Sequence, residues 1–267
     1  MKSIYEFLIG INIDLLNAVL LTVLFTVEQI FSGTASFSRR APHLLTNVIL
    51  QACYILINYG LAVGVIWVFD WVEKGNLGLL NMISISFYAK VAIGIICIDF
   101  VNYWAHRLYH TWELFWRLHR VHHSDTALDT SSSYRFHPLD ALLDNGAAVV
   151  AAIVFGLHPS SLLIWFIFYI PVLVMHHSAF IMPTWFDRTF GMVIVSPNFH
   201  KVHHHQLQEY TDSNYGQLFI FWDKMFGTFR KLPVSDIKFG LQEFDRPDRQ
   251  QTWFLIKSPF NNLRKEE

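Results

Sequence analysis

The chain has 267 residues, of which 53% are hydrophobic, 16% aromatic and only 15% charged, and its mean hydropathy is +0.32. This composition lies on the membrane side of the range for soluble globular proteins and predicts a multi-pass membrane protein. The formal net charge of -1 excludes the overall positive charge that is typical of nucleic-acid-binding proteins. The two cysteines are too few for a disulfide framework and lack a CxxC metal spacing.

The first apolar run extends from about Leu8 to Phe31, and we expect it to be a retained anchor because no secretory cleavage site is evident. Its polar side chains are costly against lipid and should face other helices or lie near the ends. They are Asn12, Asp14, Asn17 and Glu28. A soluble amphipathic helix is the alternative for this run.

Two further runs are long enough for the roughly 20 residues that cross a hydrocarbon core. The second extends from Leu44 to Phe69, and the third extends from about Ser84 to Trp104. The third run continues without a helix breaker into His106 and His110. A helix from Ser84 to His110 would be roughly 40 Å long at about 1.5 Å per residue, so we expect it to protrude from the membrane.

Eight of the fourteen histidines lie in three boxes: HRLYH at 106–110, HRVHH at 119–123 and HKVHH at 200–204. Residues three and four apart share one face of a helix, so each box can direct its imidazoles to one place. Neutral imidazole suits iron, zinc, copper or nickel. Eight ligands exceed the need of a single ion, since about four satisfy a structural zinc. The spacing therefore predicts two metal ions.

The loop charges indicate the side on which the boxes lie. Arg39 and Arg40 mark a cytoplasmic linker by the positive-inside tendency. Two crossings later the third run, with Arg107 near its end and Arg117 and Arg120 beyond, returns to that side. These signals predict a cytoplasmic histidine-rich metal-binding cap.

Two shorter apolar runs, Ala147 to Phe155 and Ser160 to Met175, flank a bend at Pro159. A hairpin that enters and leaves on the cytoplasmic face would bring His176 and His177 back beside the boxes. A single kinked span, the main competing topology, would place both on the far side. We predict an all-α membrane protein, a bundle of about three full spans plus a re-entrant or short helical hairpin, below the cytoplasmic cap.

We expect one integral-membrane domain over residues 1–267, because no repeat, low-complexity tract or linker divides the chain. Within it we distinguish N-terminal spans and loops at 1–83, a catalytic histidine-box region at 84–230 and a cytoplasmic tail at 231–267.

HRLYH, HRVHH and SPNFHKVHHH occur in this order, and NYG and WDKMFGTF follow them. This arrangement, over roughly Asp99 to Phe229, resembles the fatty acid hydroxylase/sterol desaturase superfamily of integral-membrane oxygenases. The part near the last box is similar to the alkylglycerol monooxygenase and bacterial sterol desaturase-like branches.

The resemblance implies a diiron centre that uses O2 and two electrons to attack an unactivated C–H bond of a lipid. The lipid would be a sterol, fatty acyl chain or ether lipid, and the outcome hydroxylation or desaturation. Iron is the expected metal, although zinc could occupy a purified form. No NAD(P)H or flavin motif is present, so the electrons should come from a separate reductase or a cytochrome b5-like or ferredoxin-like carrier. The membrane would be a bacterial inner membrane or the endoplasmic reticulum.

The resemblance carries the role of metal ligand to nine histidines, and no catalytic residue separate from the metal centre is implied. These nine are His106, His110, His119, His122, His123, His177, His200, His203 and His204. His177 matches an additional family histidine that precedes a proline, here Pro183. The family usually has asparagine two residues after this histidine, whereas this chain has Ala179.

Five more residues are candidates for binding metal or for orienting the ligands: His137, His176, Asp99, Asp212 and Asn214. Asp99 lies two helical turns before His106 and could accept a ring N–H. His176 adjoins a better candidate and would orient it, whereas His137 either binds metal or orders its loop. Asp212 and Asn214 closely follow the last box.

A metal transporter or metal-binding membrane protein without redox chemistry is the alternative function, and a nonenzymatic sensor is a third. A transporter holds its ligands near the membrane midplane, in broken helices. The boxes lie at or beyond the ends of the predicted spans, next to arginines. This position favours an enzyme.

Overall fold

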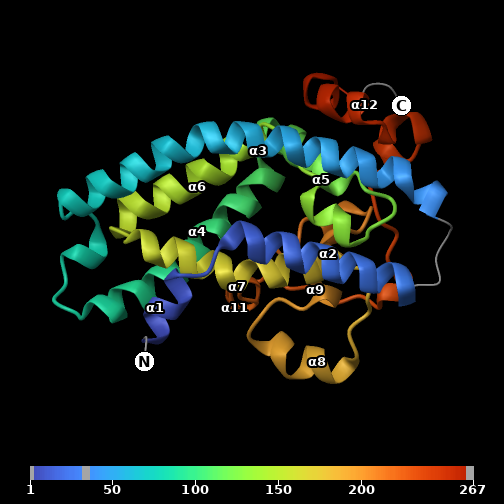
Figure 1. The fold of residues 1–267 in the computed structure, drawn as a ribbon. Helices are drawn as coiled ribbons and strands as arrows, with labels where there is room; N and C mark the ends of the chain where they lie inside the picture. Colours follow the sequence, from blue (N-terminus) through green and yellow to red (C-terminus); the bar gives the residue numbers. More distant parts are fainter. Residues whose placement is uncertain (1–2, 32–36, 263–267) are drawn as a thin grey trace.

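A computed structural model describes residues 3–31 and 37–262, and these residues form helices joined by loops (Figure 1). The α-helices are α1 (Ile4–Ile9), α2 (Ile13–Phe31), α3 (Phe37–Lys74), α4 (Phe87–Thr111), α5 (Glu113–His123), α6 (Asp140–Phe155), α7 (Pro159–His177), α8 (Thr184–Arg188), α9 (Pro197–His203), α10 (Gln208–Thr211), α11 (Phe221–Met225) and α12 (Thr252–Lys257). The 3₁₀ turns are η1 (Leu79–Asn81), η2 (Thr130–Tyr134), η3 (Phe190–Met192), η4 (Val234–Asp236), η5 (Gln242–Phe244), η6 (Pro247–Gln250) and η7 (Ser258–Phe260). The described residues contain no β-strand, which confirms the all-α prediction.

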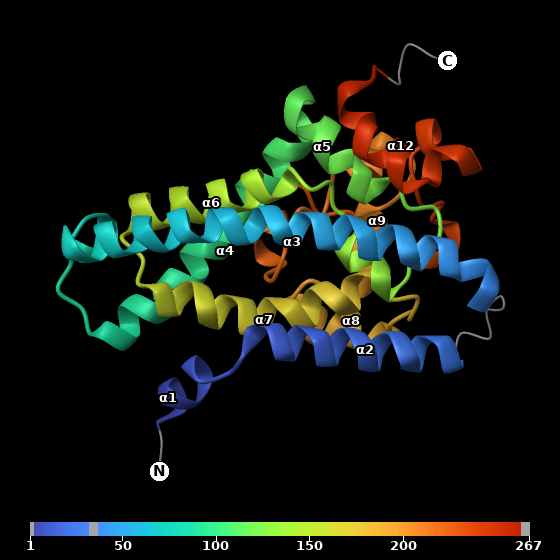
Figure 2. The ribbon, with the colours of Figure 1, turned by 45° about the horizontal axis from the view of Figure 1, so that its top comes forward.

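Four helical segments are long and apolar enough to cross a membrane. Three of them are α2, α4 and α7. The fourth is the segment Ala41–Asn81, which contains most of α3. Figure 2 shows α2, α3, α6 and α7 running alongside one another, with α5, α9 and α12 gathered toward one end of this bundle. These features match the predicted multi-pass membrane fold with a histidine-rich end. The side chains of Arg39 and Arg40, on which the cytoplasmic orientation partly rested, lie outside the described part of the chain.

The first apolar run is divided rather than continuous. α1 ends at Ile9, and α2 begins after Asn12, whose side-chain oxygen accepts the N–H of Leu15 at 2.9 Å. Such a side chain satisfies one of the free N–H groups at the start of a helix, so it fixes a new beginning there. Among the polar side chains of this run, Glu28 is fully buried. Its carboxylate accepts the N–H of Thr130 at 2.9 Å and the N–H of Ala179.

α4 carries the first box out of the bundle. It is one continuous helix of 25 residues, about 37 Å at 1.5 Å per residue, as the uninterrupted sequence predicted. Ser86 begins it by accepting the N–H of Ala89 at 3.3 Å. Trp112 ends it in an extended conformation, which allows α5 to start in a new direction with the second box.

α6 and α7 form the expected hairpin, in which α7 returns toward the end of α4 that carries the first box (Figure 2). α6 ends at Gly156, whose φ of 71° is accessible mainly to glycine. A Cβ atom on Gly156 would lie 2.2 Å from the carbonyl oxygen of Leu77, so this turn also permits a close approach to the end of α3. Pro159 then occupies the first turn of α7, where a missing N–H costs nothing.

The C-terminal segment folds back onto the helices. Leu241, Phe244 and Leu255 pack with Leu50 of α3 and Trp116 of α5 in a buried apolar cluster. Nη2 of Arg120 also donates to the carbonyl oxygens of Ser258, at 2.5 Å, and Asn261, at 3.0 Å. Residues 241–261 therefore cover the helix that carries the second box, an arrangement that the sequence did not indicate.

Candidate metal centre

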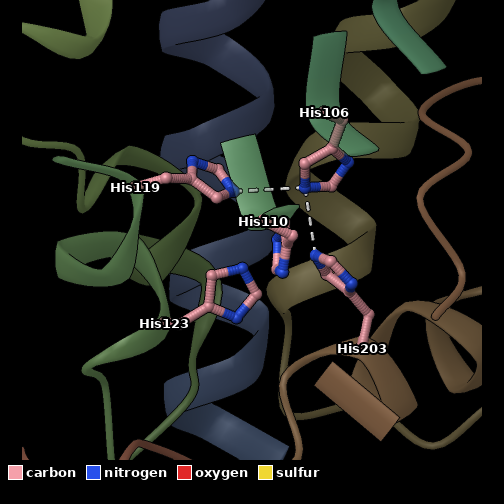
Figure 3. Close-up of side chains that lie close together, drawn as sticks. All are labelled: His106, His110, His119, His123 and His203. Carbon is pink, nitrogen blue, oxygen red and sulfur yellow. Dashed lines mark hydrogen bonds between the residues drawn. The ribbon is translucent and has the colours of Figure 1, made fainter. Parts of the chain in front are cut away.

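The nine histidines expected as ligands lie in two adjacent groups, and all nine are buried. Within each group, one potential ligand atom from every residue lies within 4.8 Å of the others. The first histidine cluster consists of His106, His110, His119, His123 and His203; the second histidine cluster consists of His122, His177, His200 and His204. Figure 3 shows the five rings of the first cluster turned toward one another from α4, α5 and α9.

The boxes do not map one to one onto the clusters. His119 and His123, four residues apart on α5, face the first cluster, whereas His122 between them faces the second. The third box is divided in the same manner, because His200 and His204 face the second cluster and His203 the first. Residues four apart share a helix face. The histidine three positions after the first one lies toward the edge of that face. Each HxxHH box thereby serves both clusters.

The segment after the third box orients rings of the first cluster. The Nδ1–H of His106 donates to the carbonyl oxygen of Tyr215 at 2.8 Å, and that of His203 donates to the carbonyl oxygen of Ser213 at 2.7 Å. Nδ1 of His110 lies 3.3 Å from Oδ1 of Asp212. Acceptors of this kind fix the tautomer and direction of a metal-binding imidazole.

These hydrogen bonds leave two lone pairs directed at each other. A carbonyl oxygen can only accept, so Nδ1 of His106 and of His203 must carry the proton and Nε2 of each neutral ring must be bare. The two Nε2 atoms are nevertheless 3.0 Å apart. Two nitrogens bound to one ion at about 2.1 Å lie roughly 3.0 to 3.4 Å from each other, so this spacing is that of a ligand pair. The arrangement fits a cation between the rings.

The second cluster shows the same feature. Nδ1–H of His177 donates to the carbonyl oxygen of Leu173 at 2.9 Å, which leaves its Nε2 as a lone pair. This Nε2 faces the Nε2 atoms of His122 at 3.1 Å, His200 at 3.2 Å and His204 at 3.2 Å. One lone pair cannot accept from three rings at once, whereas one metal ion can bind all four nitrogens.

Burial keeps these rings neutral. Desolvation lowers the pKa of the six cluster histidines that lie outside the candidate spans, and neighbouring histidines lower it further. They are His119, His122, His123, His200, His203 and His204. At neutral pH these rings are therefore not protonated, so a proton does not separate the facing Nε2 lone pairs. Neutral imidazole is also the form that binds metal.

Asp99 does not accept a histidine N–H directly, contrary to our expectation. Its carboxylate accepts the indole N–H of Trp165 at 3.0 Å and of Trp222 at 2.9 Å, and two backbone N–H groups of residues 218–219 at 3.1 Å each. These four donors fill its acceptor capacity. Asp99 instead joins α4 to α7 and to the backbone that leads back to Tyr215.

Two other candidates, His137 and His176, lie beside the clusters rather than in them. Both ring nitrogens of His137 are engaged, Nε2 with the carbonyl oxygen of Ile256 and Nδ1 with the N–H of Leu139, so this histidine orders its loop. His176 donates to the carbonyl oxygen of Val195 at 3.0 Å. Its ring stacks on that of His200 in the second cluster, with ring centroids 4.4 Å apart.

Asn214 shapes the backbone that supplies the acceptor carbonyls. It adopts a left-handed φ of 51°, which asparagine tolerates better than most residues. Its amide donates to the carbonyl oxygens of Phe199 and Arg230, and its oxygen accepts the N–H of Arg230. Of the trailing candidates, Asp212 alone touches a cluster ring directly, at His110.

Sequence reasoning did not identify several contacts of the centre. Phe136 stacks on His122 with ring centroids 4.4 Å apart and planes 3° from parallel. The carbonyl groups of Ser213 and Tyr215 carry no sequence signal of their own, because every residue has one. Their position after the last box, with Ser213 just before NYG and Tyr215 inside it, was the available indication.

The fold and this centre define a helical, apolar protein with two buried histidine clusters able to hold metal. A sequence model of the family described as fatty acid hydroxylase matches residues 91–228, just over half of the chain. The chain therefore belongs to the fatty acid hydroxylase family, within the superfamily indicated by its boxes.

Relatives in this family carry different names. The chain is 35% identical over 134 residues to an alkylglycerol monooxygenase from Caenorhabditis elegans, covering 49% of this chain and 25% of the relative. It is 35% identical over 132 residues to a very-long-chain aldehyde decarbonylase from Oryza sativa subsp. indica, covering 49% and 48%. It is 30% identical over 167 residues to a Delta(7)-sterol 5(6)-desaturase from Aspergillus fumigatus, covering 61% and 44%. The chain thus spans about half or less of these relatives' length. No solved structure matches it.

Proposed function

We propose that this chain is a membrane-bound oxygenase that holds two iron ions in its histidine clusters and hydroxylates or desaturates a lipid. The reaction would consume O2 and two electrons from a separate carrier protein. The observation that carries the proposal is the pair of bare Nε2 atoms of His106 and His203, 3.0 Å apart in a buried site. Family membership and relatives named as an alkylglycerol monooxygenase and a Delta(7)-sterol 5(6)-desaturase support the choice of reaction.

Each cluster would hold one ion through neutral imidazole nitrogens. The first would use His106, His110, His119, His123 and His203, and the second His122, His177, His200 and His204. Such a pair of iron ions supplies, when bound, the activation of O2 needed to attack an unactivated C–H bond.

The chain's own residues would orient ligands and exclude water. Tyr215 and Ser213 hold the Nδ1 protons of two rings, so those rings keep their lone pairs directed inward. Phe136 covers one face of His122, and the C-terminal segment covers α5. A dry, closed surrounding of this kind suits chemistry whose reactive species water would quench.

The lipid would enter from the bilayer between apolar helices, and the clusters would face the cytoplasm of a bacterial inner membrane or the endoplasmic reticulum. Arg107, Arg117 and Arg120 near the cluster end of α4 support this orientation. A cytoplasmic reductase, or a cytochrome b5-like or ferredoxin-like carrier, would deliver the electrons there.

A metal transporter without redox chemistry is the competing function. The histidine clusters lie at the ends of α4 and α7 and in the helices that follow, not at a break in the middle of a span. A transport site would lie near the midplane. This position favours the oxygenase.

The decisive experiment combines metal analysis with labelled oxygen. Purified protein should contain two iron ions per chain, and cells that make it should incorporate label from ¹⁸O2 into a lipid, or form a new double bond. His106→Ala and His204→Ala should lower metal content and abolish product while the protein still inserts into membranes. Full activity after either substitution, or metal flux in proteoliposomes without oxidised lipid, would refute the proposal.

A further inference from the structure

An aromatic row, formed by the rings of Tyr215, Tyr103 and Trp104, leads from the first histidine cluster to the surface of α4. The Tyr215 ring centroid lies 5.2 Å from that of His110 and 5.8 Å from that of His106. Tyr103 follows at 6.2 Å from Tyr215, and Trp104 at 5.6 Å from Tyr103. Aromatic rings in contact have centroids about 4.5 to 7 Å apart. Each step of the row is therefore a ring contact.

The inner rings of the aromatic row are buried and the outer ring is not. Tyr103 is fully buried and Tyr215 is 2% exposed, whereas Trp104 is 40% exposed. Water is thus excluded from the two tyrosines, while Trp104 can be reached from outside the bundle. The Arg107 guanidinium lies 5.2 Å from the centre of the Trp104 ring, and its positive charge opposes a cation radical on that ring. An oxidising equivalent in the row is therefore held further in.

Tyr103 is also connected to a proton acceptor. Its hydroxyl oxygen lies 2.9 Å from Oγ1 of Thr228, and that Oγ1 donates to Oδ1 of Asp223 at 2.7 Å. Threonine has one hydroxyl hydrogen and an ionised carboxylate only accepts, so the Tyr103 O–H must donate to Thr228. Both distances are within the reach of proton transfer. Burial raises the pKa of Asp223 to about 6, so it takes up a proton more readily than an ordinary aspartate does.

This relay distinguishes Tyr103 from Trp116, an oxidisable ring that contacts the first cluster directly. The Trp116 ring centroid lies 5.0 Å from that of His110. Its Nε1 is buried and has no hydrogen-bond partner among the described residues. Loss of an electron from Trp116 would leave an uncompensated positive charge in a buried place, which is costly. Tyr103 can lose an electron and a proton together and so remain neutral.

We propose that Tyr103 is a redox-active tyrosine that donates an electron to the first cluster when O2 has been activated but no lipid is in place. Without a C–H bond to attack, the oxidising equivalent would otherwise damage the histidines around it. The aromatic row offers it another destination, because a buried tyrosine with a proton acceptor can be oxidised reversibly. The inference rests on the proposed oxygenase function, which supplies the oxidant.

The step balances within the named residues. One electron passes from Tyr103 through Tyr215 to the cluster. The phenolic O–H bond of Tyr103 breaks, its proton goes to Thr228, and the Thr228 proton goes to Asp223. A neutral tyrosyl radical and a protonated carboxyl group result. The one-electron carrier of the proposed function returns the electron through Trp104, and the proton moves back from Asp223.

The test follows the tyrosyl radical itself. Iron-loaded protein without lipid is treated with hydrogen peroxide, which replaces O2 and two electrons, and is frozen. Electron paramagnetic resonance then measures organic radical per bound iron, so loss of metal alone does not lower the value. Ring-deuterated tyrosine should narrow the signal, which assigns it to tyrosine.

The variants separate the hydroxyl of Tyr103 from its packing. Tyr103→Phe keeps the ring but removes the phenolic proton, so we expect it to lose most of the radical signal. Thr228→Val interrupts the relay and should lower the signal as well. Thr228→Ser keeps a hydroxyl at the same place and should retain the signal, which a purely structural role of the threonine methyl group would not explain.

Tyr54→Phe is the matched control, because it removes a hydroxyl that also donates to a carboxylate, that of Asp144 at 2.7 Å. The ring between Tyr54 and the second cluster is that of Phe136, which is hard to oxidise. This variant should keep the signal. Absence of a tyrosyl radical in the iron-loaded wild type, an unchanged signal in Tyr103→Phe or an equal loss in Tyr54→Phe would overturn the inference.

The outcomes also separate this inference from the proposed function. A Tyr103 radical in a chain that oxidises no lipid would count against the oxygenase alone. Oxidised lipid from a chain that forms no such radical would count against the redox role of Tyr103 alone. A chain that binds no iron would overturn both.

Discussion

Asp99 and Asp223 hold neighbouring parts of one backbone segment. Asp99 accepts the N–H groups of residues 218–219 at 3.1 Å each, and Asp223 accepts those of residues 215–216 at 2.8 Å each. The carbonyl oxygen of Tyr215, within this segment, accepts from His106. Two buried carboxylates therefore act on a metal-ligand candidate through the backbone.

Asp99→Asn should weaken metal binding by the first cluster. Asparagine offers one acceptor oxygen for the four donors that now surround the carboxylate, so the segment that carries Tyr215 loses its fixed position. We expect roughly tenfold weaker binding, within the range for residues that support metal ligands. Competition with a chelator measures it. Asp70→Asn, at an exposed pair with Lys74, is the control, and equal affinities for the two variants would contradict the role.

Asp223 should make stability depend on pH. Burial raises its pKa from 3.8 to about 6, despite opposing hydrogen bonds from Thr228 and the backbone. The folded state thus binds this proton more tightly than the unfolded state does. The resulting stabilisation is fully present below about pH 4 and is lost as pH rises through about 6, and its size is about 3 kcal/mol.

The measurement is the difference in Tm between wild type and Asp223→Asn from pH 4.5 to 8 in one detergent. The contributions of all other groups largely cancel in this difference. We expect the wild type to lose stability relative to the variant as pH rises to about 6, and the difference to be constant above that. A difference independent of pH would show that Asp223 titrates normally.

Metal removal should destabilise the fold. Without a cation, the bare Nε2 atoms of His106 and His203 face each other at 3.0 Å, and a ligand that binds only the folded state stabilises it. Chelator-treated protein should unfold at a lower Tm than loaded protein, and Fe²⁺ or Zn²⁺ should restore the value. The same treatment of His106→Ala should change Tm less. An unchanged wild-type Tm would exclude metal from the clusters.

Leu255→Ala should loosen the C-terminal segment from α5. Leu255 is fully buried against Leu50 and Trp116, and truncation of such a side chain costs about 2 to 5 kcal/mol. We expect faster proteolysis between residues 231 and 262 and a lower Tm. Trp253→Ala, two residues away in the same helix at a residue that is 65% exposed, should behave as wild type. Equal sensitivity of both variants would mean that the segment is not held by this cluster.

The helical framework of the centre could be predicted because its signals are local. The uninterrupted sequence into His106 predicted a protruding α4, and Pro159 predicted the bend that returns His177. The division of each HxxHH box between two clusters could not be predicted. It depends on where α5 and α9 lie relative to each other, and helical spacing fixes only the face that each ligand shares.

The orienting groups escaped prediction because their partners are distant in sequence. Asp99 lies two turns from His106, yet its donors come from Trp165, 66 residues away, and from Trp222, 123 residues away. The C-terminal segment reads as a charged tail, but its few apolar residues meet an apolar patch formed by α3 and α5. Such pairings arise only once the chain is folded.

Glu28 has a consequence for how the protein is made. Its two backbone donors, Thr130 and Ala179, follow it by 102 and 151 residues. At a synthesis rate of about 5 to 20 residues per second, the second donor leaves the ribosome roughly 8 to 30 s after α2. Ala179 emerges just after His177, so the acid of the first span is enclosed at the same stage of biogenesis that completes the hairpin. Glu28 is therefore enclosed before the second cluster is complete, because His200 and His204 follow Ala179 in the chain.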